Sequence, residues 1–511
     1  MDKNYLKPLF QKARADLYYP PIIEFEIANV TTSEVNFKTS KYKILLGKEF
    51  ISNLSQNAII GVFHHELNHW AKHPYDVKTI ILETNWLGER KHKVIIRNLF
   101  DDVIANLDLI INKGLKEIAQ LYQEMPVINK ADHLLRAFYQ EVTGLYFGEI
   151  KIDEKLKEKL DALFQIDFLD TGRARLKNNI KQFAKIIEDL IEDIKWPFSF
   201  FSWENFCPHE IKKAMNEIAN EVDIREFEKI AQEVYGKPFL VEKGLGIQPG
   251  KKEKASPFIP PETAWYEIRA QRYAIYISGI EKTDSLYPSE IKDFSLEDPI
   301  ETYSFIESYG QILPGISKRY EMSYFEGECK VKVPDAVIVI DSSGSMKHPD
   351  RELSYAVLAA FAIARNYFEA GAKVGVINFS DKNIELFPTR ERYKVYQLLK
   401  FHQTGGTTLH IEEFKHYINK VGNVDCILIT DAGIDNLSSL IKILSHLKQR
   451  LTIIWIKTDV GRTYGFESQY QMLKQALPSW VTFVEIEDER DIPNIAIGKS
   501  FARYVRDKEI T

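Results

Sequence analysis

Residues 336–345 read Ala336-Val-Ile-Val-Ile340-Asp341-Ser-Ser-Gly-Ser345, an unbroken apolar run that ends in an acidic, hydroxyl-rich loop. A short continuous apolar run is typical of a strand that is buried on both faces of a parallel sheet. Four similar runs follow, with amphipathic helical stretches between them: 373–379, 426–429, 451–456 and 481–486. Strands that alternate with helices predict a doubly wound, parallel α/β sheet over residues 333–511.

The loop after the first of these strands has the chemistry of a cation site. Asp341, Ser343 and Ser345 offer oxygen atoms at i, i+2 and i+4, at the carboxyl end of a strand, where α/β sheets bind their ligands. Thr407, in a Gly-Gly-Thr turn, and Asp431, after the third strand, add two more oxygens. Such a donor set suits Mg²⁺ or Mn²⁺. An Asp- and Ser-rich turn without a metal is the alternative.

Nearer the N-terminus, a second motif reads His65-Glu66-Leu-Asn-His69, inside a helical stretch over 55–73. A helix brings i and i+4 onto one face, so His65 and His69 can share one Zn²⁺, and Glu66 beside them can take a proton from water. An exposed His-rich helix end is the alternative. His73, at i+8, lies about 12 Å along the axis from His65, too far to join the same ion unless the helix breaks first.

A catalytic zinc site needs a third protein ligand and an open position. The next helical stretch carries Asn98, Asp102 and Asn106 at i, i+4 and i+8 on an otherwise apolar helix. Polar groups on a buried face need partners, which a zinc ion and its surrounding hydrogen bonds would supply; a solvated helix face is the alternative. Asp102 is therefore the expected third ligand, with Asp101 as its neighbouring alternative. The chemistry expected is metal-assisted hydrolysis, with Glu66 as general base and then proton donor.

Composition excludes several functions. The 511 residues carry 67 Lys and Arg against 73 Asp and Glu, a net charge of −6 without a basic block, which argues against nucleic acid as the main partner. The longest apolar run falls far short of the ~20 residues that span a membrane. Three cysteines are too few for a disulfide framework, and no export signal is visible, so a cytoplasmic protein is expected. Zinc would have to be held by His and carboxylate, as in hydrolytic sites.

The pattern along the chain predicts a multidomain protein of about three domains. Two short strands, 22–27 and 42–46, precede the His65 helix and indicate an α+β domain. The expected divisions are an N-terminal domain 1–130, a helical region 131–242, a Gly-, Pro- and Lys-rich linker 243–262, a mixed connector 263–332, and the α/β domain 333–511.

The C-terminal pattern resembles the metal-ion-dependent adhesion site of von Willebrand factor A domains, which have a Rossmann-like fold. The resemblance implies five residues that hold the ion directly or through water: Asp341, Ser343, Ser345, Thr407 and Asp431. It also implies that an acidic side chain of a protein partner or substrate completes the ion's shell. Asp431 is followed by Ala where many relatives have Gly, a departure that retains the carboxylate.

Both ends together resemble a bacterial and archaeal family of metallopeptidase domains fused to von Willebrand A-like domains. This resemblance implies a zincin-like N-terminal domain with His65, His69 and Asp102 as zinc ligands and Glu66 as catalytic acid/base. Many members are thought to work with MoxR-type AAA+ ATPases. Two functions are therefore expected: a zinc peptidase that recruits a partner through Mg²⁺, or a non-catalytic adaptor or co-chaperone for such an ATPase. Glu66 favours the peptidase, because a structural site needs no carboxylate beside its ligands.

Overall fold

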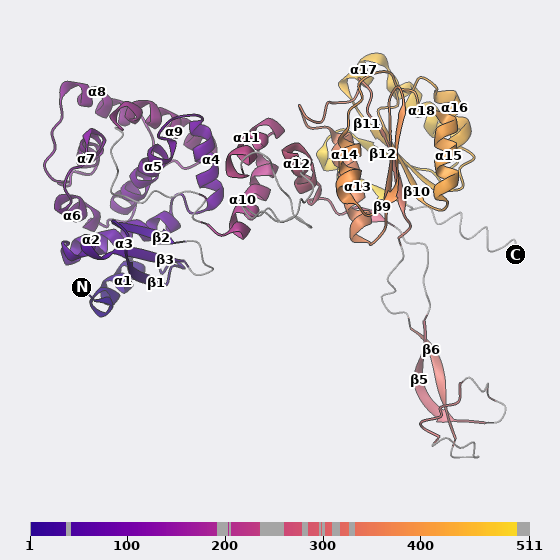
Figure 1. The fold of residues 1–511 in the computed structure, drawn as a ribbon, viewed down its shortest axis with the longest axis horizontal. Coiled ribbons are helices and arrows are strands. Elements are labelled where there is room, and N and C mark those ends of the chain that lie inside the picture. The colour runs from indigo at the N-terminus through magenta and orange to yellow at the C-terminus, as the bar shows by residue number, and fades with distance from the viewer. Residues whose placement is uncertain are drawn as a thin grey trace. The chain divides into compact units, whose positions relative to one another are not determined.

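The computed structural model describes residues 2–36, 42–191, 203, 206–235, 260–277, 285–295, 298, 302–308, 317–325 and 333–497. The chain forms two compact units, Met1–Glu262 and Thr263–Thr511, and both mix helices with strands (Figure 1). The predicted multidomain α/β organisation is thus confirmed. Most of the expected linker 243–262 lies outside the described residues. Among the described residues, no helix is both long and apolar enough to cross a membrane.

The N-terminal unit begins with helix α1 (Lys3–Asp16) and a three-stranded sheet of β1 (Glu24–Ala28), β2 (Ser33–Asn36) and β3 (Lys43–Gly47). The strand order is β1-β3-β2; β1 runs parallel to β3, and β2 runs antiparallel to β3 at the edge. The short helix α2 (Lys48–Ser52) follows β3. Phe10, Phe25 and Phe63 pack together, with ring centroids 5.1–5.5 Å apart, and so fasten α1 and β1 to the helix that carries the His65 motif.

Three successive helices carry the N-terminal candidate site: α3 (Gln56–Ala71), α4 (Val77–Leu87) and α5 (Lys93–Leu107). The Ser55 side chain accepts a hydrogen bond from the Ala58 amide and so caps the start of α3. The helix ends three residues before Pro74, which cannot continue it. The stretch that carries Asn98, Asp102 and Asn106 is helical, as expected, and continues into a π-helical turn, Asp108–Asn112.

The remaining helices of this unit are α6 (Glu117–Glu124), α7 (Lys130–Thr143), α8 (Glu154–Leu163), α9 (Arg173–Ile187), α10 (Pro208–Glu221) and α11 (Ile224–Tyr235). Helices α9, α10 and α11 pack against α4, so they belong to the same compact unit as the His65 motif. Helix α6 approaches α3 most closely at Gly61, where a Cβ atom would lie 2.5 Å from the Glu117 carbonyl oxygen.

The C-terminal unit is built on a six-stranded sheet: β7 (Ala336–Asp341), β8 (Val374–Phe379), β9 (Asn383–Thr389), β10 (Asp425–Thr430), β11 (Arg450–Ile456) and β12 (Thr482–Ile486). The order is β12-β11-β10-β7-β8-β9, and five strands are parallel. The expectation of a purely parallel sheet is wrong at one edge, where β9 pairs antiparallel with β8. Strand β9 is only partly buried and has no continuous apolar run. The sequence pattern that indicated the other strands therefore did not indicate β9.

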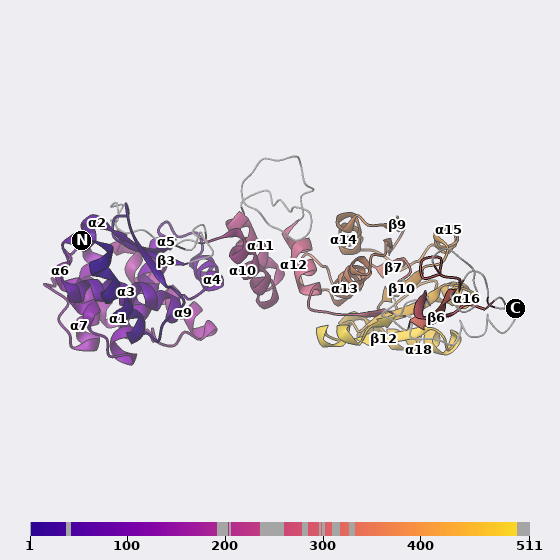
Figure 2. The same cartoon turned by 90° about the horizontal axis from the view of Figure 1, so that it is seen from below.

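Helices cover both faces of this sheet. Helices α13 (Tyr355–Glu369) and α14 (Arg392–Lys400) lie on one face (Figure 2). The other face carries α15 (Ile411–Val421), α16 (Leu437–Leu444) and α18 (Phe466–Ala476), with the short α17 (Asp459–Tyr464) before α18. The predicted doubly wound arrangement is therefore present, and the chain crosses from one half of the sheet to the other between β7 and β10.

Part of the stretch expected as a connector packs on this sheet unit. Helix α12 (Pro261–Ala270) places the Tyr266 hydroxyl 3.1 Å from the Glu352 carbonyl, and the same hydroxyl accepts from the Ser354 amide at 2.9 Å. Strand β4 (Tyr276–Ile277) pairs with β13 (Ala496–Ile497). Strands β5 (Ser285–Asp293) and β6 (Lys318–Phe325) form a separate antiparallel pair.

Candidate metal centres

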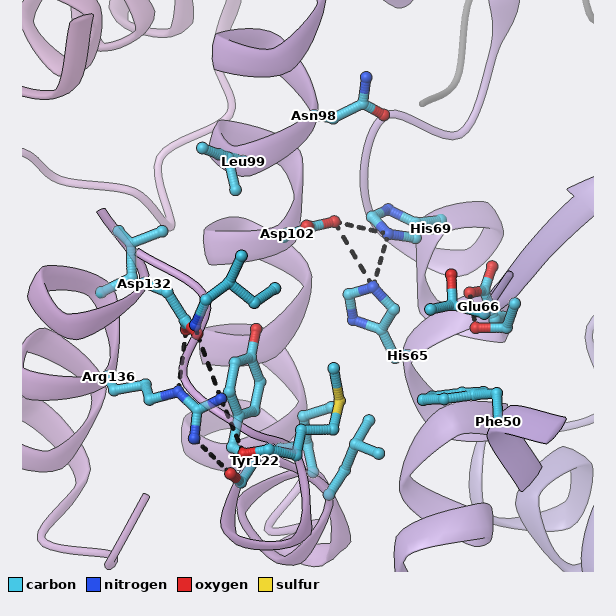
Figure 3. Close-up of a pocket in the computed structure, with 17 residues that line it drawn as sticks. Phe50, His65, Glu66, His69, Asn98, Leu99, Asp102, Tyr122, Asp132 and Arg136 are labelled. Carbon is cyan, nitrogen blue, oxygen red and sulfur yellow. Dashed lines mark hydrogen bonds and ion pairs between the residues drawn. The ribbon is translucent and has the colours of Figure 1, made fainter. Parts of the chain in front are cut away.

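The first candidate centre lies between α3 and α5. His65 and His69 on α3 turn their Nε2 atoms toward each other and toward Asp102 on α5 (Figure 3). The two Nε2 atoms are 3.1 Å apart, and Asp102 Oδ1 lies 3.4 Å from that of His65 and 3.2 Å from that of His69. The structure thus brings together the three side chains that the motif spacing singled out.

The size of this triangle fits a zinc ion. Zinc bonds of about 2.0–2.1 Å in tetrahedral geometry separate neighbouring donor atoms by about 3.3 Å. The three separations of 3.1–3.4 Å match that value. Asp101, the neighbouring alternative, points elsewhere: its Oδ2 lies 3.1 Å from Arg97 Nη1, and its Oδ1 lies 3.2 Å from His73 Nε2.

Hydrogen bonds at the opposite ring nitrogens orient both imidazoles. His65 Nδ1 donates to Asn106 Oδ1 at 2.8 Å, and His69 Nδ1 donates to the His73 carbonyl at 3.0 Å. Because both partners are acceptors, each Nδ1 carries a proton and each Nε2 faces the triangle. Asn106 is held in turn by the hydroxyls of Tyr122 and Tyr139, each 3.2 Å from its Nδ2. A histidine whose Nδ1 keeps its proton in this way binds a metal through Nε2.

The electrostatics of the triangle favour positive charge. Burial opposes the charged imidazolium, but the hydrogen bond and negative charge of Asp102 outweigh it and raise the pKa of His65 to about 9. Burial likewise opposes the Asp102 carboxylate, yet its hydrogen bonds to His65 and His69 hold the pKa of Asp102 well below its usual range. A bound cation would take the place of the proton that these groups otherwise share.

Glu66 lies beside the triangle and lines the same pocket. Ser33 Oγ, from the edge strand β2, donates to Glu66 Oε1 at 2.6 Å. Glu66 Oε2 is buried and has no hydrogen-bond partner among the described residues. A buried carboxylate oxygen without a partner is costly, which is typical of a group that acts on a ligand rather than one that only stabilises the fold. Sequence reasoning missed Ser33, because no local pattern connects β2 to α3.

Asn98, the first residue of the expected polar stripe, is not in the triangle. Its Nδ2 donates to the Val94 carbonyl at 2.7 Å, one turn back on its own helix. The residue lines the same pocket as the triangle but contributes no atom to the three close separations. Of the three residues in the stripe, Asp102 therefore belongs to the triangle and Asn106 orients His65.

Behind His69 lies a fully buried cluster of His73, Glu83, Arg97 and Asp101. His73 Nε2 is 2.7 Å from Glu83 Oε1 and 3.2 Å from Asp101 Oδ1. Burial opposes charge on His73, but the carboxylates of Glu83 and Asp101 prevail and raise the pKa of His73 to about 10. Burial and the negative charge of Asp101 raise the pKa of Glu83 to about 7. The ligand atoms of His73, Glu83 and Asp101 also lie close enough together to hold a metal ion. The cluster fixes His73, whose carbonyl orients His69.

The second candidate centre lies between β7 and β10, where the order in which strands are added to the sheet reverses. Asp341 ends β7 and Asp431 follows β10; the two strands are neighbours, with Ile340 opposite Ile429. Asp341 Oδ1 accepts from the Ser343 amide at 3.0 Å, and its Oδ2 accepts from Thr430 Oγ1 at 2.8 Å. Ligands of open α/β sheets bind outside the strand ends at this switch.

The remaining oxygens come from loops that converge on the same edge. Ser343 Oγ and Ser345 Oγ are 3.1 Å apart. The loop that carries Thr407 is joined to the Asp341 loop by two backbone hydrogen bonds, Gly344 N to Gly405 O at 3.1 Å and Thr404 N to Ser342 O at 3.2 Å. All five predicted residues therefore lie in neighbouring loops at the carboxyl ends of the strands.

Two buried carboxylates face each other at this centre. Burial, with the negative charge of Asp431, raises the pKa of Asp341 to about 7. Burial also raises the pKa of Asp431, whose Oδ2 accepts from Thr458 Oγ1 at 3.2 Å. A divalent cation among carboxylate and hydroxyl oxygens would relieve this repulsion, so the donor set fits Mg²⁺. The sequence did not indicate Thr430 or Thr458. Each donates a hydrogen bond to an aspartate at the end of a neighbouring strand, and local sequence does not show which strands are neighbours.

In its described parts the chain is thus a two-unit α/β protein, with a candidate centre of two histidines and an aspartate in one unit and a candidate centre of carboxylate and hydroxyl oxygens in the other. No protein-family model matches the chain, and no curated protein matches it either.

Proposed function

We propose that the chain is a zinc-dependent metallopeptidase. Its N-terminal unit would be zincin-like and hydrolyse peptide bonds, and its C-terminal unit would be a von Willebrand A-like domain that recruits a substrate or partner. The observation that carries the proposal is the donor triangle of His65, His69 and Asp102 beside Glu66, open to one pocket. A carboxylate beside an open nitrogen-and-carboxylate metal site is the arrangement of hydrolytic zinc enzymes.

Each residue at the first centre has a part in this chemistry. His65, His69 and Asp102 would hold zinc, which when bound supplies Lewis-acid activation of water and of the peptide carbonyl. Glu66, which lines the pocket, would take a proton from the attacking water and return it to the leaving amine. Ser33 donates to one oxygen of Glu66 and so orients its carboxylate.

The C-terminal unit would act through Mg²⁺ or Mn²⁺. The order in which strands are added to the sheet reverses between β7 and β10, and the loops of Asp341, Thr407 and Asp431 lie at that point. Both features support a von Willebrand A-like site. Ser343 and Ser345 would share in holding the ion. An acidic side chain of the partner would then complete the ion's shell and make binding cation-dependent.

Metal analysis joined to one substitution tests the peptidase. The purified chain is expected to carry stoichiometric zinc and to digest casein. Glu66→Gln should keep the zinc and lose at least 100-fold in hydrolysis, because it removes the base and not a ligand. Glu49→Gln, an exposed carboxylate on α2, is the matched control and should change neither. A chain without stoichiometric zinc would contradict the proposal.

The second candidate function is a non-catalytic adaptor or co-chaperone for a MoxR-type AAA+ ATPase, in the cytoplasm. The oxygen-only centre favours it, because cation-dependent recruitment needs no hydrolysis. Zinc present without proteolysis, both alone and with a candidate ATPase, would decide for the adaptor. Loss of binding to that ATPase in Asp341→Ala, with zinc content unchanged, would support it further.

A further inference from the structure

The donor triangle opens into a pocket of about 130 Å³ whose exposed lining is more apolar than polar (Figure 3). About 10–15 Å³ is enough for one water, so the space is about ten times larger than a single water needs. We call the aliphatic part of this lining the apolar wall, which comprises Leu99, Ile118, Leu121, Met125, Ile128 and Leu135. The wall is assembled from α5, α6, α7 and the segment between α6 and α7.

Two further charged residues line this pocket besides His65, Glu66, His69 and Asp102. They are Asp132 and Arg136, and they form an ion pair with each other. Arg136 Nε lies 2.9 Å from Asp132 Oδ1, and Nη2 lies 3.2 Å from Asp132 Oδ2. Asp132 Oδ2 also accepts from the Ile128 amide at 3.0 Å. The acid is therefore occupied on both oxygens.

Every N–H of the Arg136 guanidinium has an acceptor within the protein. Beyond Asp132, Nη1 donates to the carbonyls of Tyr122 and Phe147, and Nη2 donates to those of Met125 and Pro126. A guanidinium has five N–H donors, so none remains for a substrate carboxylate. A charged side chain that entered this pocket would lose hydration and could not pair with Arg136 or Asp132.

We propose that this pocket receives a bulky apolar side chain adjacent to the cleaved peptide bond, so the substrates are peptides with Leu, Ile, Met or Phe at that position. The inference rests on the proposed peptidase function, since the donor triangle supplies the reference point for the cleaved bond. Continuity between the triangle and the apolar wall places the recognised side chain next to the reacting group.

Hydroxamates test the inference without any need for turnover, because the hydroxamate group binds zinc and the rest of the molecule probes the pocket. The full zinc-loaded chain is titrated calorimetrically with acetohydroxamate, with 4-methylpentanohydroxamate and with the monohydroxamate of succinic acid. The isobutyl-bearing compound is expected to bind at least tenfold more tightly than the carboxylate-bearing one. Equal binding of the two would overturn the inference and leave the zinc site intact.

A substitution in the apolar wall should reverse the preference. Met125 is only partly buried, so Met125→Lys can place an ammonium in the pocket without opening the core. This variant should bind the succinic monohydroxamate more tightly than 4-methylpentanohydroxamate. Met472→Lys, on the exposed face of α18, is the control and should keep the original order. An unaltered preference in a folded Met125→Lys would overturn the inference.

The two proposals fail in different ways. If the chain takes up no zinc and acetohydroxamate does not bind, both are overturned. If zinc and acetohydroxamate bind and peptides are cut, the residues beside the cuts in a mixed peptide pool, read by mass spectrometry, decide the inference alone. Apolar residues at one fixed position support it, and charged residues there overturn it.

Discussion

At the scale of single residues, the first centre depends on groups that do not touch the metal position. Asn106 is fully buried and connects His65 to two tyrosine hydroxyls, so it determines which His65 nitrogen carries the proton. The buried cluster of His73, Glu83, Arg97 and Asp101 does the same for His69 through a backbone carbonyl. Such supporting hydrogen bonds set ligand orientation and metal affinity.

Asn106→Leu should lower zinc affinity by about 10- to 100-fold, because it removes the acceptor that holds the His65 ring. Competition with a chromogenic chelator measures the affinity. Asn57→Leu, on the exposed first turn of α3, serves as the control and should have wild-type affinity. Unchanged affinity in a folded Asn106→Leu would show that the ring needs no such support.

Glu83→Ala should reduce the free energy of unfolding of the N-terminal unit by about 3–5 kcal/mol, because it leaves buried His73 without one of its two carboxylates. Urea unfolding of the zinc-free chain measures this change. Glu89→Ala, an exposed site near the end of α4, should cost less than about 0.5 kcal/mol. If the two variants lose equal stability, the cluster does not stabilise the unit.

At the scale of elements, helix contacts determine the shape of the pocket. Helix α6 contributes Ile118 and Leu121 to the apolar wall and lies against α3 at Gly61. The same α3 carries the two histidines, so the separation of these helices sets the distance from the wall to the triangle. In the other unit, helix α12 packs against the start of α13.

Gly61→Ala should destabilise the N-terminal unit by about 1–3 kcal/mol, because its Cβ would lie 2.5 Å from a backbone carbonyl oxygen that cannot rotate away. It should also weaken binding of 4-methylpentanohydroxamate more than that of acetohydroxamate. Thermal unfolding and calorimetry measure the two effects. Asn57→Ala on the same helix should show neither, and a Gly61→Ala chain with wild-type stability would contradict the close packing.

Glu267 on α12 predicts a pH dependence of the C-terminal unit. Burial raises the pKa of Glu267, and the nearby Arg392 and Arg365 only partly offset this. A raised carboxyl pKa means that the folded state binds the proton more tightly than the unfolded state. The associated stability is complete below the unfolded pKa and is lost as pH rises through the folded pKa. Wild-type stability should therefore fall with pH in this window.

Glu267→Gln lacks this loss, so its melting temperature relative to wild type should be higher at pH 8 than at pH 4. Calorimetry at the two pH values measures the difference. Glu467→Gln, an exposed carboxyl on α18, should show no such trend. A Glu267→Gln chain that loses stability relative to wild type as pH rises would show the opposite sign and contradict the assignment.

At the scale of the whole molecule, the two centres belong to separate compact units and use different donor chemistry. Zinc should therefore stabilise the unit with His65, and magnesium the unit with Asp341, each by about 2.7 kcal/mol at a metal concentration near 100 times Kd. Asp341→Asn should remove the magnesium effect and leave zinc content unchanged; Asp102→Asn should do the reverse. Calorimetry with metal analysis measures both. Loss of zinc in Asp341→Asn would contradict the separation.

The elements themselves followed largely from the sequence. The strands of the C-terminal sheet that are buried on both faces appeared as continuous apolar runs, whereas β9, at the edge, did not. The His65 and His69 pair was predictable because i and i+4 share one helix face whatever surrounds the helix. The loop of Asp341, Ser343 and Ser345 was predictable for the same reason, since its spacing is local.

What only the tertiary structure decided is which faces of distant elements meet. Asp101 and Asp102 point about 100° apart on α5, and the rotation of that helix against α3 selects Asp102. Ser33 reaches Glu66 from another strand, and Arg136 is matched by carbonyls from three other segments. Periodicity along the chain determines the element and the face that each side chain occupies. Distances between faces depend on how the elements pack, and the local sequence pattern does not determine them.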